Sequence, residues 1–325
     1  MEEQIFQERT DLTALSDAVA SIRNEIKKII VGQDEMVKLI ITALLADGHV
    51  LIEGVPGVAK TLTAKLVAKS VEAGFSRIQF TPDLMPSDVL GTPVFNPKDA
   101  VFEFRKGPIF SNVILVDEIN RAPAKTQSAL LEIMEERQAT IDGKTYPMAS
   151  PFMVLATQNP VEQEGTYRLP EAQLDRFLFK ITVPYPLEAE EASMLMQFHS
   201  MGNRSALETI QPVLKASQII ALRQQIKNQI IEEKLLQFIA RLVSQTRSHK
   251  SIYLGASPRA SLGLMNASKA TAAMQGRDFV TPDDILSVVT PVLRHRIILS
   301  PDKEMEGITE DEVIKQIVHS IDVPR

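Results

Sequence analysis

A glycine-containing stretch, EGVPGVAKTLTAK at residues 53–65, carries most of the residue types that bind a phosphate group. The phosphate-loop pattern G-x-x-x-x-G-K-[ST] uses backbone amides to cradle the anion, a lysine to reach the β- and γ-phosphates, and a hydroxyl to bind Mg²⁺. Gly54 begins the pattern, Lys60 and Thr61 end it, but Ala59 replaces the last glycine. The alanine is tolerable in a helix-like turn and costly only if its φ must be positive. The stretch predicts a nucleotide site, with an ordinary strand–helix turn as the alternative.

Two further polar elements stand at the ends of apolar runs that are typical of strands. Asp117 and Glu118 follow VILV, and Asn159 follows FMVLATQ. The carboxyl ends of parallel strands open into the crevice where α/β proteins bind ligands. There Asp117 would hold Mg²⁺, directly or through water, Glu118 would orient and activate the attacking water, and Asn159 would position it from the γ-phosphate side. Each element alone also fits a solvated strand end or an Asn-Pro turn. Their combination with the loop favours nucleotide chemistry.

The apolar runs that carry these residues predict an α/β core. Strands are expected at residues 49–54, 76–80, 112–118, 152–160 and 180–186. Helices are expected at residues 12–30, about 34–46, 60–73 and 124–138. Apolar strands that alternate with helices are typical of a parallel sheet covered on both faces.

Two β-hairpins and a helical second region complete the predicted organisation. The first hairpin is expected at residues 92–105, and the second at residues 139–148 around an Asp-Gly turn pair. From about residue 187 onward the strand patterns stop, and helices are expected at residues 188–200, 215–226, 232–247, 258–275 and 281–297. We therefore expect a nucleotide-binding core at residues 1–188 and an all-helical domain at residues 189–325.

The composition excludes several other classes of site. The 325 residues include no cysteine, so disulfides, thiolate nucleophiles and cysteine-bound zinc are excluded. A net charge of −6 does not favour a nucleic-acid or anionic-membrane surface. None of the five histidines has a metal-ligand partner at helical or hairpin spacing. The amino terminus lacks the apolar core of a secretory signal, and no run approaches the roughly 20 apolar residues of a membrane span, so a cytoplasmic protein is expected.

Five motifs taken together resemble the MoxR family of AAA+ ATPases. They are the loop at residues 54–61, Asp117-Glu118, Asn159, LPEAQLDRF at residues 169–177 and GASPRA at residues 255–260. The resemblance covers nearly the whole chain, and alanine at the last glycine of the loop is common in the family. It implies a parallel five-stranded P-loop αβα core of the AAA+ type. The two hairpins would be the helix-2 insert and the pre-sensor-1 insert, and a helical lid domain would follow.

The resemblance assigns roles to the matching residues. Lys60 and Thr61 are similar to the Walker A pair, Asp117 and Glu118 to the Walker B pair, and Asn159 to sensor 1. ATP and Mg²⁺ are the implied cofactors, with Thr61 and Asp117 as metal ligands. The implied nucleotide-binding residues are Val31, Gly32 and Gln33 over the adenine, then Gly54, Val55, Pro56, Gly57, Val58, Ala59, Lys60, Thr61 and Leu62 in the loop, and Asp117.

Two arginines receive catalytic roles from the resemblance. Arg259 resembles the sensor-2 arginine, which the helical lid carries to the γ-phosphate. Arg176 resembles the arginine finger supplied to the ATP of the neighbouring subunit, and Arg121 and Arg168 are its rivals for that role. Without the family, Arg176 would fit a surface ion pair and Arg259 a helix residue that faces solvent.

The resemblance implies a homo-oligomeric ring, expected to be a hexamer, that hydrolyses ATP and remodels partner proteins in a chaperone-like way. A protein with a von Willebrand factor A domain is the usual partner, and the sequence does not indicate the client. Two alternatives stay open: a nucleotide-gated assembly scaffold with negligible hydrolysis, and a nucleic-acid motor. Glu118, Asn159 and Arg176 favour hydrolysis, because a scaffold need not keep a water activator or a trans arginine. The acidic balance argues against a motor.

Overall fold

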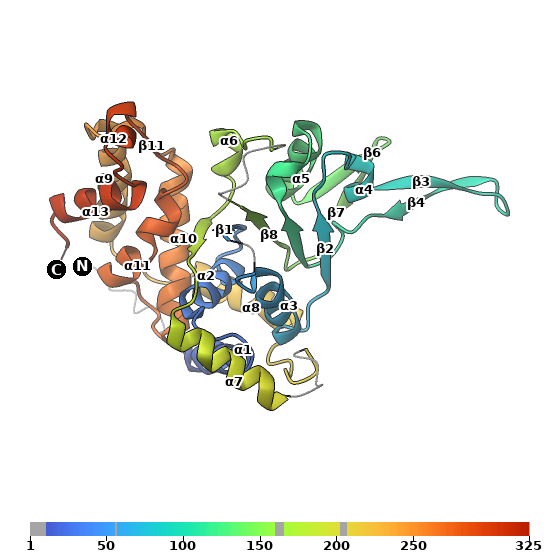
Figure 1. Cartoon of the computed structure of the whole chain (residues 1–325), viewed down its shortest axis with the longest axis horizontal. Helices are drawn as coiled ribbons and strands as arrows, with labels where there is room; N and C mark the ends of the chain where they lie inside the picture. Colours follow the sequence, from blue (N-terminus) through green and yellow to red (C-terminus); the bar gives the residue numbers. More distant parts are fainter. Residues whose placement is uncertain (1–10, 56, 160–165, 202–206, 325) are drawn as a thin grey trace, which may run out of the picture.

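The computed structural model describes residues 11–55, 57–159, 166–201 and 207–324. Within them, a five-stranded parallel sheet has the strand order β2-β5-β8-β1-β9 (Figure 1). Its strands are β1 (Val50–Gly54), β2 (Phe75–Gln79), β5 (Val113–Asp117), β8 (Met153–Gln158) and β9 (Phe179–Val183). All five lie within two or three residues of the predicted bounds, so the parallel α/β core is confirmed.

The apolar runs form central strands because both of their faces are buried. All five residues of β5 are buried, and they alternate between two hydrophobic clusters. Val113 and Leu115 belong to the first cluster, whereas Ile114 and Val116 belong to the second. A strand with two apolar faces requires a layer of helices on each side of its sheet. The sheet is therefore the middle layer of an α/β/α sandwich.

Each face of the sheet has its own set of helices. On the side of the first cluster are α1 (Thr13–Lys27), α2 (Asp34–Leu45) and α3 (Lys60–Ser70). On the side of the second cluster are α4 (Pro86–Leu90), the 3₁₀ turn η1 (Ile119–Arg121) and α5 (Ala124–Glu136). The apolar stripe predicted for the first helix is buried, as amphipathic spacing requires.

Both predicted hairpins are present. They are β3 (Gly91–Asn96) with β4 (Val101–Lys106), and β6 (Gln138–Ile141) with β7 (Lys144–Pro147). The β3–β4 hairpin extends far from the sheet (Figure 1). Its base contacts the second hairpin through Phe104 and Tyr146, whose ring centroids are 4.5 Å apart.

The carboxyl-terminal part is helical, with one correction to the expected all-helical domain. Its helices, after the short α6 (Glu171–Leu174), are α7 (Glu188–Met201), α8 (Ala216–Lys227), α9 (Glu233–Ser248), α10 (Pro258–Met274), α11 (Pro282–Leu293), α12 (Pro301–Met305) and α13 (Glu310–Ser320). The correction is a two-stranded antiparallel ribbon of β10 (Ile252–Leu254) and β11 (Ile298–Leu299). These pieces are too short for a periodic signal, and they pair only because the fold brings two distant segments together.

The carboxyl-terminal helices pack on the same side of the sheet as the amino-terminal ones. The first cluster joins Ile22 of α1 and Leu44 of α2 with Leu264 of α10. α7 begins at Glu188, but this cluster continues on both sides of that residue, so the division of the chain at residue 188 stays a prediction. Among the described helices, none is both long and apolar enough to cross a bilayer.

His49 is a buried, neutral link between β1, β8 and α5. Its Nδ1 accepts a hydrogen bond from the amide of Val154 at 3.0 Å, so its Nε2 carries the proton and donates to the carbonyl of Met134 at 3.0 Å. Burial, with a smaller contribution from the charge of Arg137, lowers the pKa of His49 to about 3.

His295 has a similar role at the end of α11. Its Nε2 lies 2.9 Å from the carbonyl oxygen of Phe177. Burial, followed by the charge of Arg296, holds the pKa of His295 well below its ordinary value. Within the described ranges, no group of three His, Cys, Asp or Glu side chains is placed to hold a metal ion. Both histidines therefore serve the fold.

We expect the protein to lose stability in mild acid, because neither His49 nor His295 can accept a proton in the folded state. The unfolded chain takes up these protons near pH 6.5. Stability is therefore complete above that pH and decreases as the pH falls toward the depressed folded pKa. At pH 5 each histidine should cost about 2 kcal/mol of the free energy of unfolding. Denaturant unfolding at pH 7.5 and at pH 5 measures this loss.

The matched variants of this experiment are His49→Gln and His199→Gln. Glutamine can donate and accept hydrogen bonds but does not titrate, so His49→Gln should make the pH profile flatter. His199 is exposed on α7, so its replacement should leave the profile unchanged. Equal stability of the native protein at both pH values would contradict the assignment.

Candidate nucleotide-binding site

The predicted phosphate loop connects β1 to α3. Gly54 ends β1, and Gly57 has a φ of +88° that favours glycine. Ala59 precedes α3, and Lys60 is the first residue of that helix. The Nζ of Lys60 donates to the carbonyl oxygen of Gly54 at 2.6 Å, so the lysine folds back over the loop. Pro56, also predicted to bind the nucleotide, lies outside the described residues.

Ala59 has the left-handed backbone conformation, in which a residue with a Cβ is less stable than glycine. Its φ is +58°, in the left-handed region. The Cβ of an L-residue makes this region less favourable than for glycine by roughly 1–2 kcal/mol. The methyl group packs against the first hydrophobic cluster, which offsets part of that cost. The general pattern thus has glycine at this position because the turn requires a positive φ, and this chain forms the same turn with alanine.

We expect Ala59→Gly to stabilise the protein by about 1 kcal/mol and to leave nucleotide affinity within a few-fold of the native value. The reason is that the loop already has the backbone that glycine prefers. Thermal unfolding and equilibrium ATP binding measure the two effects. Ala64→Gly, inside α3, is the matched control and should destabilise by a similar amount or more. ATP binding that appears only in Ala59→Gly would show that the native loop is degenerate.

The strand order brings the predicted polar residues to one edge of the sheet. β8 lies between β5 and β1. Adjacent strands are about 4.8 Å apart, and all three end at the same edge because they are parallel. Asp117 and Glu118 at the end of β5, Asn159 after β8 and the loop after β1 are therefore neighbours. Asn159 is 9% exposed. This edge, the carboxyl edge, brings together the phosphate loop, the two carboxylates and the amide that the sequence singles out.

Asp117 is nearly buried and is held on both of its oxygens. The Nε of Arg77, on β2, lies 2.6 Å from Oδ2. The hydroxyl of Thr157, on β8, donates to Oδ1 at 3.2 Å. The ion pair and the hydrogen bond compensate the burial of the carboxylate and fix its orientation.

Glu118 leaves the strand in the left-handed region, with φ +57°. Its backbone amide donates to the Thr157 hydroxyl at 3.0 Å. Its Oε2 accepts from Nε2 of Gln79 at 2.8 Å and lies 3.1 Å from Nε of Arg121. A positive φ for glutamate is uncommon and persists where surrounding contacts impose it. The turn directs Glu118 along the carboxyl edge instead of across the strand.

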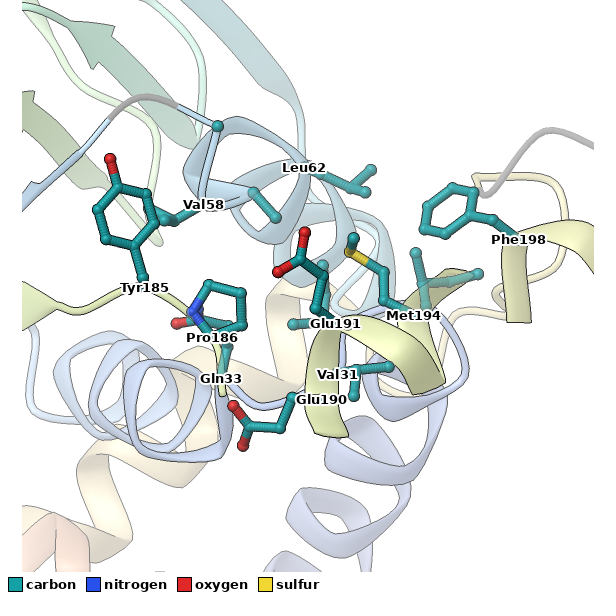
Figure 2. Close-up of a pocket in the computed structure, with 14 residues that line it drawn as sticks. Val31, Gln33, Val58, Leu62, Tyr185, Pro186, Glu190, Glu191, Met194 and Phe198 are labelled. Carbon is teal, nitrogen blue, oxygen red and sulfur yellow. The ribbon is translucent and has the colours of Figure 1, made fainter. Parts of the chain in front are cut away.

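A cavity of about 370 Å³ lies beside the loop (Figure 2). Six of the residues predicted to bind the nucleotide line it: Val31, Gln33, Gly57, Val58, Ala59 and Leu62. Gly32 has φ +75°, which favours glycine, and a Cβ there would lie 2.5 Å from the carboxyl carbon of Glu190, whose side chain would have to move. Val55 packs against the first hydrophobic cluster instead of lining the cavity. The mainly apolar lining suits a flat base.

The opposite wall of this cavity was missed by the sequence analysis. It includes Tyr185 and Pro186, before α7, and Glu190, Glu191, Met194 and Phe198 on α7 (Figure 2). The only local signal was the Pro-Tyr-Pro segment after the last predicted strand. The sequence of α7 shows no marked apolar stripe. In agreement with this, several apolar side chains of the helix are exposed.

The structure places Arg259 differently from the sequence expectation. Its Nη2 lies 2.5 Å from Oε1 of Glu135, and Nη1 of Arg176 lies 3.7 Å from the other oxygen of the same carboxylate. Arg176 also donates to the carbonyl of Leu131 at 2.8 Å. Arg176 lies just before β9 in the chain, and there the amide of Leu178 donates to the carbonyl of His49, which precedes β1.

The pair therefore lies at the amino edge of the sheet, opposite to Lys60. A five-residue strand such as β1 is about 16 Å long, and the phosphate loop begins beyond its far end. Arg259 thus does not reach the γ-phosphate of a nucleotide bound by its own loop. The physical reason is that the first turn of α10 packs against the segment that enters β9, which fixes the lid at the amino edge.

The two rival arginines lie elsewhere. Arg121 pairs with Glu118 of its own subunit, at the carboxyl edge. Arg168 is exposed. Arg77, Gln79 and Glu135 carry no local signal in the sequence, because their roles depend on contacts that only the fold creates.

Comparisons with known proteins define the class and then the family. Residues 49–179 match the model of the ATPase family associated with various cellular activities (AAA), and residues 244–317 match the AAA lid domain. The fold and the lid are therefore those of an AAA-type ATPase.

Three relatives narrow this class. Chaperone MoxR1 of Mycobacterium tuberculosis is 44% identical over 93% of this chain and 81% of its own length. Protein MoxR of Methylorubrum extorquens is 30% identical over 96% of this chain and 97% of its own length. A crystal structure from Cytophaga hutchinsonii, 43% identical, superposes with a TM-score of 0.89 and covers 96% of this chain and 97% of its own. The chain belongs to the MoxR family of AAA+ ATPases.

Proposed function

We propose that this protein binds ATP with Mg²⁺ at the carboxyl edge, hydrolyses the ATP, and uses the energy to remodel partner proteins in a chaperone-like way. The observation that carries the proposal is the convergence of the phosphate loop, Asp117, Glu118 and Asn159 at one edge of the sheet. Membership of the AAA+ ATPases and the similarity to Chaperone MoxR1 support it.

The side chains present fit a Mg²⁺ site. The Thr61 hydroxyl and the Asp117 carboxylate are hard oxygen donors, which Mg²⁺ prefers. Arg77 and Thr157 hold that carboxylate in place. When bound, Mg²⁺ would neutralise charge on the phosphates. Lys60 would contact the β- and γ-phosphates.

Glu118 and Asn159 would position and activate the attacking water. Glu118 would orient it and take up its proton, and Asn159 would position it beside the γ-phosphate. In this proposal the cavity between the loop and α7 holds the base. Val31 and Gln33 line one side of this cavity, and Gly32 lies between them in the chain.

Arg176 and Arg259 would both act on the nucleotide of a neighbouring subunit. They share Glu135 at the amino edge, away from their own Lys60. In a ring closed by head-to-tail contacts, each contact joins two different surfaces, and here these would be the amino edge of one subunit and the carboxyl edge of the next. A ring, expected to be a hexamer, is therefore the proposed working form. A von Willebrand factor A domain protein is the proposed partner, and a nucleotide-gated scaffold is the main alternative function.

The test of this proposal begins with Lys60→Ala. Loss of the cation should weaken ATP binding by roughly 10- to 100-fold, because hydrogen bonds to charged groups contribute about 1.5–3 kcal/mol. Equilibrium titration with ATP and Mg²⁺, together with phosphate release, measures binding and turnover.

The matched control is Lys65→Ala, which removes the same charge from the same helix without touching the loop. It should bind and hydrolyse ATP as the native protein does. The proposal fails if the native protein neither binds nor hydrolyses ATP. Native binding without measurable phosphate release would instead support the scaffold.

A further inference from the structure

A polar cluster built around the buried Arg296 joins the lid to the core beside the two arginines. Oδ1 of Asp175 lies 2.7 Å from Nε of Arg296, and Oδ2 accepts from the hydroxyl of Ser257 at 2.7 Å. Asp175 precedes β9, Arg296 follows α11, and Ser257 is the N-cap of α10. These three residues, the Asp175 cluster, tie three separate segments together.

Arg296 holds the backbone that leads into β9. Its side chain is only 3% exposed. Besides its bond to the Asp175 carboxylate, it donates to the carbonyl oxygens of Asp175 at 3.0 Å, Leu178 at 3.1 Å, and Phe177. A buried guanidinium is costly unless its donors are satisfied, and here one carboxylate and several carbonyls satisfy them. The segment that contains Arg176 is thereby fixed in place.

Both arginines are attached directly to the Asp175 cluster. Arg176 is the residue after Asp175 in the chain. The backbone amide of Arg259 donates to the hydroxyl of Ser257 at 3.1 Å, as part of the N-cap of α10. One arginine therefore comes from the core and the other from the lid, and the bond between Asp175 and Ser257 links their backbones.

We propose that the Asp175 cluster is a positioning unit that sets Arg176 and Arg259, as a pair, for the phosphates of the neighbouring subunit. The inference rests on the proposed trans role of the arginines. The two arginine side chains are 29% and 45% exposed, so they can reach a neighbour, whereas the buried Arg296 cannot. The cluster acts through the arginines and does not touch the nucleotide.

A cluster that only stabilised the fold would behave differently in mixed rings. Each interface needs an acceptor, which supplies Lys60 and Glu118, and a donor, which supplies the arginine pair. A general loss of folding would damage a subunit in both capacities. A positioning defect would damage the donor capacity alone.

The test uses Asp175→Asn and Ser257→Ala, with Ser257→Thr as the conservative variant that keeps the hydroxyl. A misplacement of about 1 Å can cost roughly 100-fold in rate, so we expect turnover to fall by roughly 10- to 100-fold in the first two variants. ATP binding should be unchanged, and Ser257→Thr should recover most of the turnover. Thr309→Ala is the matched control, because it removes a side-chain N-cap from α13 in the same lid but lies outside the cluster.

Mixing experiments then separate the two capacities. Asp175→Asn mixed with Lys60→Ala should regain turnover, because native arginines from the latter meet native acceptor sites of the former. Asp175→Asn mixed with Arg176→Ala should not regain turnover, because every donor is then defective. Weakened ATP binding by Asp175→Asn, or no recovery with Lys60→Ala despite shown co-assembly, would overturn the inference.

The arm that mixes Arg176→Ala with Lys60→Ala tests the underlying function separately. If that arm shows no recovery, the trans role itself is wrong. If it recovers but the Asp175→Asn arm does not, only the positioning role is wrong. If Thr309→Ala loses as much turnover as Ser257→Ala, loss of a helix cap explains the effect, and the inference is likewise overturned.

Discussion

Glu118→Gln should bind ATP with native affinity but hydrolyse it at least 100-fold more slowly. General-base assistance contributes about 10²- to 10⁴-fold to reactions of this type. The substitution removes the carboxylate that takes the proton and leaves Lys60, Thr61 and Asp117 in place. The glutamine can still bond to Gln79, so the left-handed turn at this residue should be retained. Phosphate release under saturating ATP, with ATP binding measured in parallel, checks both parts.

Two controls make this result specific. Glu132→Gln, on the exposed side of α5, removes the same charge at a distance from the site and should be neutral. Asp117→Asn should damage both Mg²⁺ use and turnover, and it should also leave Arg77 without its charged partner. Equal turnover by Glu118→Gln and the native protein would rule out the role assigned to Glu118. The trapped ATP-bound form of Glu118→Gln is also the best bait for client proteins.

Arg176→Ala should bind ATP normally but lose turnover by at least 100-fold. Trans arginines contribute roughly 10³- to 10⁵-fold in the GTPases where they have been measured. Arg259→Ala should show the same pattern, because both side chains meet at Glu135 on the amino edge. Since the site is complete only between subunits, the specific activity of the native protein should rise with protein concentration. Phosphate release across a dilution series measures this rise.

Mixing is the stricter test of the trans assignment. Arg176→Ala and Lys60→Ala, each inactive alone, should regain part of the activity when they assemble together. At some interfaces the intact Lys60 site of one variant then meets the intact Arg176 of the other. Arg168→Ala tests the exposed rival for the trans role and should remain active. A turnover rate independent of concentration, together with no recovery in demonstrably mixed assemblies, would leave Arg176 as an ion-pair residue of the surface.

The sequence by itself determined the strands of the sheet and the edge at which the candidate site residues lie. Runs such as VILV form strands because their apolar side chains need burial on both faces, and parallel strands must end at one edge. This rule predicts that Asp117, Glu118 and Asn159 lie at the same edge as the phosphate loop, whereas their adjacency follows from the strand order. Local pattern and strand direction were enough to predict this common edge, since Asp117 ends its strand and Glu118 and Asn159 directly follow theirs.

Only the tertiary structure decided what these groups contact and which edge the lid occupies. Arg77 and Gln79, on β2, contact Asp117 and Glu118 because β2 pairs with β5 across nearly forty residues of chain. Arg259 lies at the amino edge because α10 packs beside the start of β9, more than seventy residues earlier. Such contacts depend on how distant segments pack, and no periodicity within one segment records them. The positive φ of Ala59 is likewise imposed by the turn between β1 and α3, not by the preference of alanine.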